Sequence, residues 1–180
     1  MNSIIIRPFV VFFIIIGSQS YALPFPVSFP GTSEAPDPTG RYSILWFESS
    51  PHEAFFKNLK SGQISSLLGF NRGIDILWSP DGNALAITDH SGSSESSVLI
   101  TRTDGPIHLF NLEDVFIRFF GMPYEIYENG HRYFEASEWV NSSTLLFKVK
   151  AHDAYPGKSY EGVFRYELGG EIKKEINLQK

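Results

Sequence analysis

The chain has 180 residues, with 15 basic and 20 acidic side chains and a formal net charge of −5. This mildly acidic balance, without any cluster of Lys and Arg, excludes nucleic acid as an expected partner, because binding to phosphates needs grouped positive charge. The chain has no cysteine, so packing alone must stabilise the fold, and 16 Phe, 8 Tyr and 3 Trp supply the bulky side chains for it.

The first 22 residues have the pattern of an export signal. Arg7 supplies a positive charge, residues 9–16 form a short apolar core, and Ser20 and Ala22 are small residues at the two positions that a signal peptidase reads. We therefore expect cleavage after Ala22 and a periplasmic or secreted protein. Small secreted eukaryotic domains usually carry disulfides, so the lack of cysteine favours a bacterial host. The alternative is a retained membrane anchor, which needs about 20 apolar residues, and only then do we expect contact with a membrane.

Residues 23–39 are rich in proline, which lacks a backbone donor and favours extended geometry. We expect an irregular arm that follows the edge of the folded domain. Within this arm, residues 27–29 are the segment able to pair as a short strand.

The strongest local order lies in residues 77–87, which read as an apolar strand, a tight turn and a second apolar strand. The ring of Pro80 already fixes its φ at a value that suits a turn, and Gly82 tolerates the backbone conformation needed at the end of that turn. This Trp-Ser-Pro-Asp-Gly pattern, followed by small apolar residues, resembles the repeat of TolB-like, WD-repeat-like β-propeller proteins. In those proteins it joins two neighbouring strands of one blade. The resemblance implies an architecture and not an activity, because propellers host many functions.

A repeat extends on both sides of this turn. Residues 40–47 match residues 82–89, and residues 55–62 match residues 98–105, at offsets of about 42 or 43 residues, the period of a four-stranded blade. A third, looser copy spans residues 139–147 and 163–172. Between the second and third copies lies an insert at about residues 111–132. Its segment 112–120 reads either as a short helix capped by Asn111 or as a strand.

We therefore predict an all-β fold for residues 40–180. It would be a single domain of antiparallel, four-stranded, blade-like sheets, a partial or small β-propeller-like structure; a β-sandwich or barrel is the alternative. Closed propellers need about four to eight blades, and the chain has material for about three. The open faces would be covered by the proline-rich arm and the insert, by a second copy, or by another protein.

The sequence lacks a nucleophile elbow, a phosphate-binding glycine loop and a dinucleotide fingerprint, so we expect no enzymatic activity and no cofactor. Two pairs of neighbouring residues, Asp89 with His90 and His152 with Asp153, follow equivalent strands in two repeats. They are weak candidates for a metal site, and loop residues in solvent explain them equally well.

The insert and the residues after it concentrate aromatic side chains with polar tips, which are frequent where proteins or sugars bind. The candidate partner-binding residues are Tyr124, Tyr127, His131, Tyr133 and Phe134; packing in the core is the alternative for these aromatics. The leading expectation is thus an exported, non-enzymatic protein that binds another protein, as an inhibitor or immunity-type protein or as a scaffold. The alternative is a small-molecule, sugar or metal-binding module, or a weak hydrolase.

Overall fold

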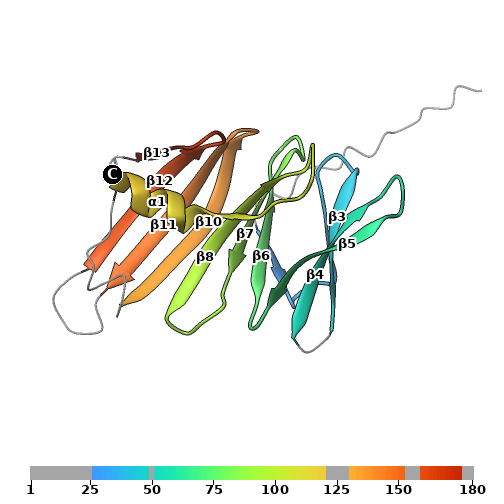
Figure 1. The fold of residues 1–180 in the computed structure, drawn as a ribbon, viewed down its shortest axis with the longest axis horizontal. Helices are drawn as coiled ribbons and strands as arrows, with labels where there is room; N and C mark the ends of the chain where they lie inside the picture. Colours follow the sequence, from blue (N-terminus) through green and yellow to red (C-terminus); the bar gives the residue numbers. More distant parts are fainter. Residues whose placement is uncertain (1–25, 49–50, 121–129, 153–158, 176–180) are drawn as a thin grey trace, which may run out of the picture.

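The computed structural model describes residues 26–48, 51–120, 130–152 and 159–175, which contain thirteen strands and one helix. The expected export signal, residues 1–22, lies outside these ranges. The strands form a four-stranded sheet and a nine-stranded sheet, and a short parallel pairing between β8 (Glu95–Arg102) and β10 (His131–Asn141) divides the larger one into two parts. We call the four-stranded sheet the first sheet, and the two parts of the larger one the second and third sheets. Figure 1 shows them in chain order, with the helix beside the third. The prediction of an all-β fold is confirmed by this arrangement.

The first sheet has the strand order β2-β3-β4-β5 and is antiparallel throughout. Its strands are β2 (Glu34–Pro36), β3 (Tyr42–Phe47), β4 (His52–Asn58) and β5 (Ile64–Phe70). Residues 34–36 of the proline-rich arm, expected to be irregular or to follow an edge, form β2, an edge strand that pairs with β3. Proline is tolerated here because β2 is an edge strand, where an N–H is not needed on the open side.

The second sheet contains the turn that the sequence marks most clearly. Its strands are β6 (Ile74–Trp78), β7 (Ala84–Asp89), β8 (Glu95–Arg102) and β9 (Phe110–Asn111), with β1 (Val27–Phe29) on the far side of β6. Between β6 and β7, the Ser79 hydroxyl oxygen accepts a hydrogen bond from the Ala84 N–H at 2.9 Å, and Gly82 has a φ of 66°. The predicted strand, turn and strand are confirmed, and residues 27–29 do form a strand.

One helix, α1 (Leu112–Phe120), follows β9 directly. The Asn111 side-chain oxygen accepts a hydrogen bond from the Glu113 N–H at 2.9 Å, as an N-cap does. Leu112 and Phe116 are fully buried, one turn apart on the same face of the helix. Of the two interpretations that the sequence leaves open for this segment, the helix is therefore the right one.

The third sheet crosses the face of the second. Its strands are β10 (His131–Asn141), β11 (Thr144–His152), β12 (Ser159–Glu167) and β13 (Glu171–Lys174). Strand β10 begins beside β8, where Tyr133 lies in parallel register with Ser96. At its other end the Trp139 indole N–H donates to the Leu77 carbonyl of β6 at 3.0 Å. The parallel pairing of β8 with β10 joins the second and third sheets through hydrogen bonds.

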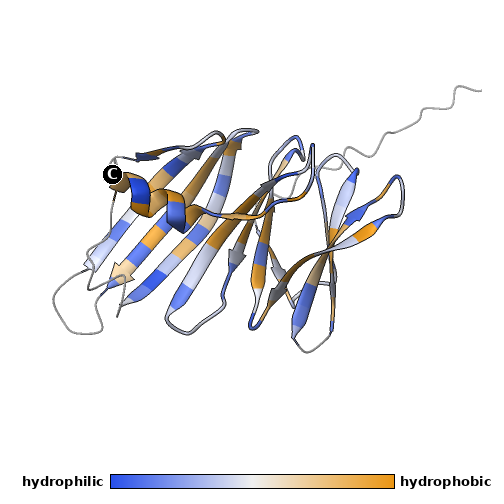
Figure 2. Cartoon of the chain, in the orientation of Figure 1, coloured by the Kyte–Doolittle hydropathy of each residue, from blue (hydrophilic) through white to orange (hydrophobic). Residues whose placement is uncertain are grey.

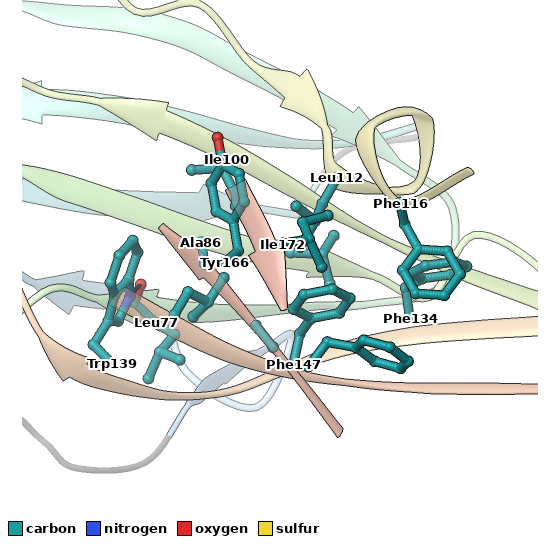
Figure 3. Close-up of a cluster of buried hydrophobic side chains, with 14 of the residues drawn as sticks. Leu77, Ala86, Ile100, Leu112, Phe116, Phe134, Trp139, Phe147, Tyr166 and Ile172 are labelled. Atoms are coloured by element: carbon teal, nitrogen blue, oxygen red, sulfur yellow. Dashed lines mark hydrogen bonds between the residues drawn. The ribbon is translucent and has the colours of Figure 1, made fainter. Parts of the chain in front are cut away.

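Two buried clusters hold the three sheets together. The first lies between the first and second sheets and includes Ile44, Phe56, Ile76, Trp78 and Leu85. The second lies between the second and third sheets, and Figure 3 shows α1 contributing Leu112 and Phe116 to it. Residues of β7 alternate between the clusters, so the second sheet is covered on both faces. The first and third sheets each keep one outer face.

Candidate interaction surfaces

The outer face of the first sheet follows from the strand register. Ala35, Ile44, Ala54 and Phe56 belong to the buried cluster, so the residues that alternate with them point the other way. The side chains on this outer face are those of Glu34, Pro36, Leu45, Phe47, Glu53, Phe55, Lys57, Ile64 and Ser66, with Gly69 at one corner; Ser43 shares the register of this face, but its side chain is fully buried.

This outer face is largely apolar. Phe47 is 52% exposed and Ile64 is 48% exposed, and the half-buried Phe55 lies against Phe47 with ring centroids 5.4 Å apart. Leu45 pairs with Phe55 in the register and fills the middle of the face. The carboxylate oxygen of Glu53 accepts a hydrogen bond from the Ser66 hydroxyl at 2.5 Å. Such a contiguous patch of large apolar side chains indicates an interaction site.

The outer face of the third sheet is charged. Strand β10 carries exposed glutamates, β11 exposed lysines, and β12 a further exposed glutamate, Glu161, and Figure 2 shows hydrophilic bands between apolar ones on these strands. Lys150 pairs with Glu161 at 3.3 Å, and Arg165 pairs with Glu175 at 2.6 Å. A polar outer face of this kind is what terminal repeats need in order to stay soluble. The two outer faces of the molecule therefore differ in kind.

Three candidate residues from the sequence come together at one end of the third sheet. His131 and His152 lie opposite each other in the register, with their rings stacked and the centroids 4.7 Å apart. The Tyr133 hydroxyl lies 3.1 Å from Nδ1 of His131 and donates to the Ser93 carbonyl at 3.0 Å. The sequence pattern suggests a partner-binding surface for His131 and a metal site for His152, whereas the register of β10 and β11 makes the two residues neighbours.

Phe134 is not a surface residue. It is fully buried, and its ring packs edge-on against Phe116 with the centroids 5.4 Å apart. Its assignment to a partner-binding surface is wrong, because consecutive residues of a strand face opposite ways and Tyr133 takes the outer position. Tyr124 and Tyr127 lie outside the described residues.

The proposed metal ligands do not form a cluster in the described part of the chain. Nε2 of His90 lies within hydrogen-bond distance of a carboxylate oxygen of Asp75, at 2.8 Å, and Asp153 lies outside the described residues. Among the described residues, no group of three or more His, Cys, Asp or Glu side chains could hold a metal ion. Burial raises the pKa of the Asp89 carboxyl, and the charge of His90 opposes this rise.

A small polar cavity of about 180 Å³ lies between the second sheet and α1. Glu95 and Glu113 line it, and Arg132 pairs with both, at 3.4 Å and 3.0 Å. Burial raises the pKa of the Glu113 carboxyl, and the Arg132 charge opposes that rise. Because Arg132 already neutralises these carboxylates, the pair is better explained as an ion pair that fixes α1 to β10.

The class of protein that these observations define is an all-β chain built from blade-like sheets, with one apolar and one charged end. No protein-family model and no curated protein matches the sequence. Among solved structures, the chain is similar to the crystal structure of TolB from Acinetobacter baumannii, with a TM-score of 0.39 and 14% sequence identity.

The similarity covers 83% of this chain and 32% of that chain, so this chain spans about a third of its length. A TM-score this low carries no argument about function. The all-β class therefore rests on the strands themselves. In the described part of the chain, no helix has the length and apolar character needed to cross a membrane.

Proposed function

We propose that the chain is an exported, non-enzymatic protein that works by binding a protein surface through the outer face of its first sheet. The observation that supports this function is the contrast between the two ends of the molecule. Phe47 and Ile64 are about half exposed on the first sheet, whereas the outer face of the third sheet carries paired charges.

The physical reason is the free energy of leaving apolar side chains in water. Each fully buried Phe or Ile side chain stabilises a complex by about 1.5–3 kcal/mol relative to the exposed state. Monomeric proteins therefore rarely keep such a contiguous patch unless it has a use. An inhibitor of a toxic enzyme and a scaffold of the cell envelope would both use a face of this kind. The segment that carries Tyr124 and Tyr127 is proposed as a second contact.

A photo-crosslinking amino acid in place of Phe47 tests this function in the host cell. We expect a crosslink from position 47 to a protein, and no crosslink from position 140. Val140 is the matched control because it is 45% exposed and lies on the third sheet. Equal crosslinking at both positions, or at neither, contradicts the proposed function.

Export is tested separately, on the intact mass of the protein purified from the same cells. A mass that begins at Leu23 is expected for a chain whose signal has been removed after Ala22. A mass that includes residues 1–22 contradicts this cleavage and favours the retained anchor.

A further inference from the structure

We propose that the partner on this outer face is a second copy of the chain, packed on it through a two-fold axis that reverses the strand direction. This inference rests on the proposed function, because it takes the first sheet as the binding face. It adds the identity of the partner and the geometry of the contact, which follow from the placement of charge and volume on β4 and its neighbours.

The charges on this face are self-complementary. Glu53 and Lys57 lie on the same side of β4, with Phe55 midway between them. The two first sheets face each other, and the two-fold axis lies in the plane between them, at right angles to the β4 strands and level with Phe55. Rotation about this axis sets each β4 antiparallel to the β4 of the other copy. Glu53 of each copy then faces Lys57 of the other. An axis parallel to the strand would instead bring like charges together, which is unfavourable.

The side-chain volumes are self-complementary about the same axis. On β3, Phe47 lies beside Glu53 and Ser43 lies beside Lys57, so the reversal sets each Phe47 over the position of Ser43, whose own side chain is fully buried and adds no volume at the surface. On β5, Ile64 lies beside Lys57 and Gly69 beside Glu53, so each Ile64 lies over a glycine. Large residues facing small ones let two sheets interdigitate at their ordinary separation of about 10 Å.

Head-to-tail stacking of copies fits the charges badly. It would press the outer face of the third sheet, which carries the exposed Lys148 and Lys150, onto the apolar face of the first. Burying charged groups against apolar side chains is costly, because the charges lose their water without gaining a partner. Two-fold pairing leaves both charged faces at the ends of the assembly. The contact therefore closes after two copies.

The outer face of the first sheet is small, and this limits the expected affinity of the dimer. Four strands about 4.8 Å apart and six residues about 3.3 Å apart give a footprint of roughly 19 by 20 Å. This footprint of roughly 380 Å² is less than half of the roughly 800 Å² per partner of a standard interface, so we expect a weak dimer, whose dissociation constant depends on the quality of the contact and not on its area alone.

Sedimentation velocity on the full chain, over a dilution series of roughly 1 to 200 µM, tests the proposal. The wild type is expected to shift from monomer to dimer. Phe47→Glu is expected to weaken dimerisation at least about tenfold, because it buries a charge at the contact. The matched control Val140→Glu should leave the dimer unchanged. Circular dichroism of each variant establishes that it is folded.

Charge reversal tests the two-fold geometry itself. Glu53→Lys alone places Lys against Lys in both contacts, and Lys57→Glu alone places Glu against Glu, so each variant is expected to dimerise several-fold more weakly than the wild type. An equimolar mixture of the two variants restores both contacts. It should form a mixed dimer with close to wild-type affinity.

Three results would overturn the proposal: a monomer at every concentration, a dimer that Phe47→Glu leaves intact, or variants that fail to recover affinity when mixed. Failure of the underlying function is distinguishable from these results. If position 47 crosslinks only to a different protein in the cell, the binding face stands and the second copy is excluded. If it crosslinks to nothing, both ideas fail.

Discussion

The indole N–H of Trp139 donates to the carbonyl of Leu77 at 3.0 Å, and so connects the first strand of the third sheet to the first long strand of the second. The same contact occurs one sheet earlier, where the Trp78 indole donates to the Ala35 carbonyl of β2 at 3.1 Å. Both bonds are buried. Each tryptophan therefore fixes its own sheet to the sheet before it, Trp78 to the edge strand β2 and Trp139 to β6.

Replacing either tryptophan by Phe should remove this inter-sheet bond while keeping most of the apolar volume. We expect Trp139→Phe and Trp78→Phe each to lower the free energy of unfolding by about 1–3 kcal/mol, because the carbonyl loses a buried partner. Urea unfolding measures the loss. The two bonds lie at different junctions, so the double variant should lose the sum of the two. A loss within experimental error for both single variants would show that water replaces the indoles.

The glycines of two equivalent turns should respond differently to alanine. Gly40 and Gly82 have φ values of 70° and 66°, and nothing lies within 4 Å of a Cβ at Gly40. A Cβ at Gly82 would collide with a carboxylate oxygen of Asp37, which is fully buried. The Asp37 carboxylate accepts a hydrogen bond from the Tyr42 N–H at 2.7 Å and cannot move aside easily.

We expect Gly40→Ala to cost about 1–2 kcal/mol, the strain of a left-handed residue with a side chain. Gly82→Ala should cost about 3 kcal/mol or more, since strain and collision add. Thermal unfolding of the two variants side by side measures the difference. Equal melting temperatures would mean that Asp37 moves aside from a Cβ at Gly82 without a cost in stability.

Helix α1 should depend on one phenylalanine and not on its neighbour three residues later. The Phe116 ring is fully buried and lies edge-on to Phe164 with centroids 4.9 Å apart, whereas Phe119 is 55% exposed. Phe116→Ala is therefore expected to cost about 3–5 kcal/mol in unfolding free energy. Phe119→Ala should change it by no more than about 0.5 kcal/mol. Comparable losses in the two variants would place α1 elsewhere on the sheet.

Stability at neutral pH should be reduced by Asp89. Burial raises the pKa of this carboxyl in the folded state, and its buried Oδ1 has no hydrogen-bond partner among the described residues. An acid whose folded pKa is raised binds its proton more tightly in the folded state than in the unfolded state. Its contribution is therefore most favourable below the unfolded pKa, and stability falls as the pH rises through the interval between the two pKa values.

Asp89→Asn should remove this pH dependence. The variant is expected to match the wild type at acidic pH and to be more stable at pH 7, as measured by urea unfolding across the pH range. The control is Asp104→Asn, on an exposed residue whose pKa is lowered by its hydrogen bond to Arg102. A wild-type profile in Asp89→Asn would show that its carboxyl is solvated in the folded chain.

The sequence predicts the parts of the fold that depend on local chemistry. The turn at residues 78–82 needs a proline, a side-chain acceptor and a glycine in fixed order, so it can be read without knowledge of the rest of the chain. The helix 112–120 is marked by its cap, Asn111, although apolar runs of that length suit strands equally well. Contacts between sheets leave no such local mark.

What the sequence could not supply was the face on which each side chain lies. Tyr133 and Phe134 look alike in composition, and only the phase of β10 sends one outward and the other into the core. Side chains alternate between the two faces of a strand, and this alternation along residues 131–136 was the signal that could have assigned Tyr133 and Phe134 to opposite faces. The apolar outer face of the first sheet was also missed, because Phe47 and Ile64 come from different strands and meet only through the register.

The pairing of β1 with β6 joins the two ends of the segment that contains the first sheet. Phe29 lies opposite Ile74 in the register, and a Cβ on Gly73 would come within 2.9 Å of the Phe29 carbonyl oxygen. The segments that enter and leave the first sheet, which end at Phe29 and begin at Gly73, therefore lie next to each other. Residues 31–72 therefore leave the second sheet and return to it at adjacent points, so the pairing of β1 with β6 closes the first sheet into a loop whose ends are fixed to each other.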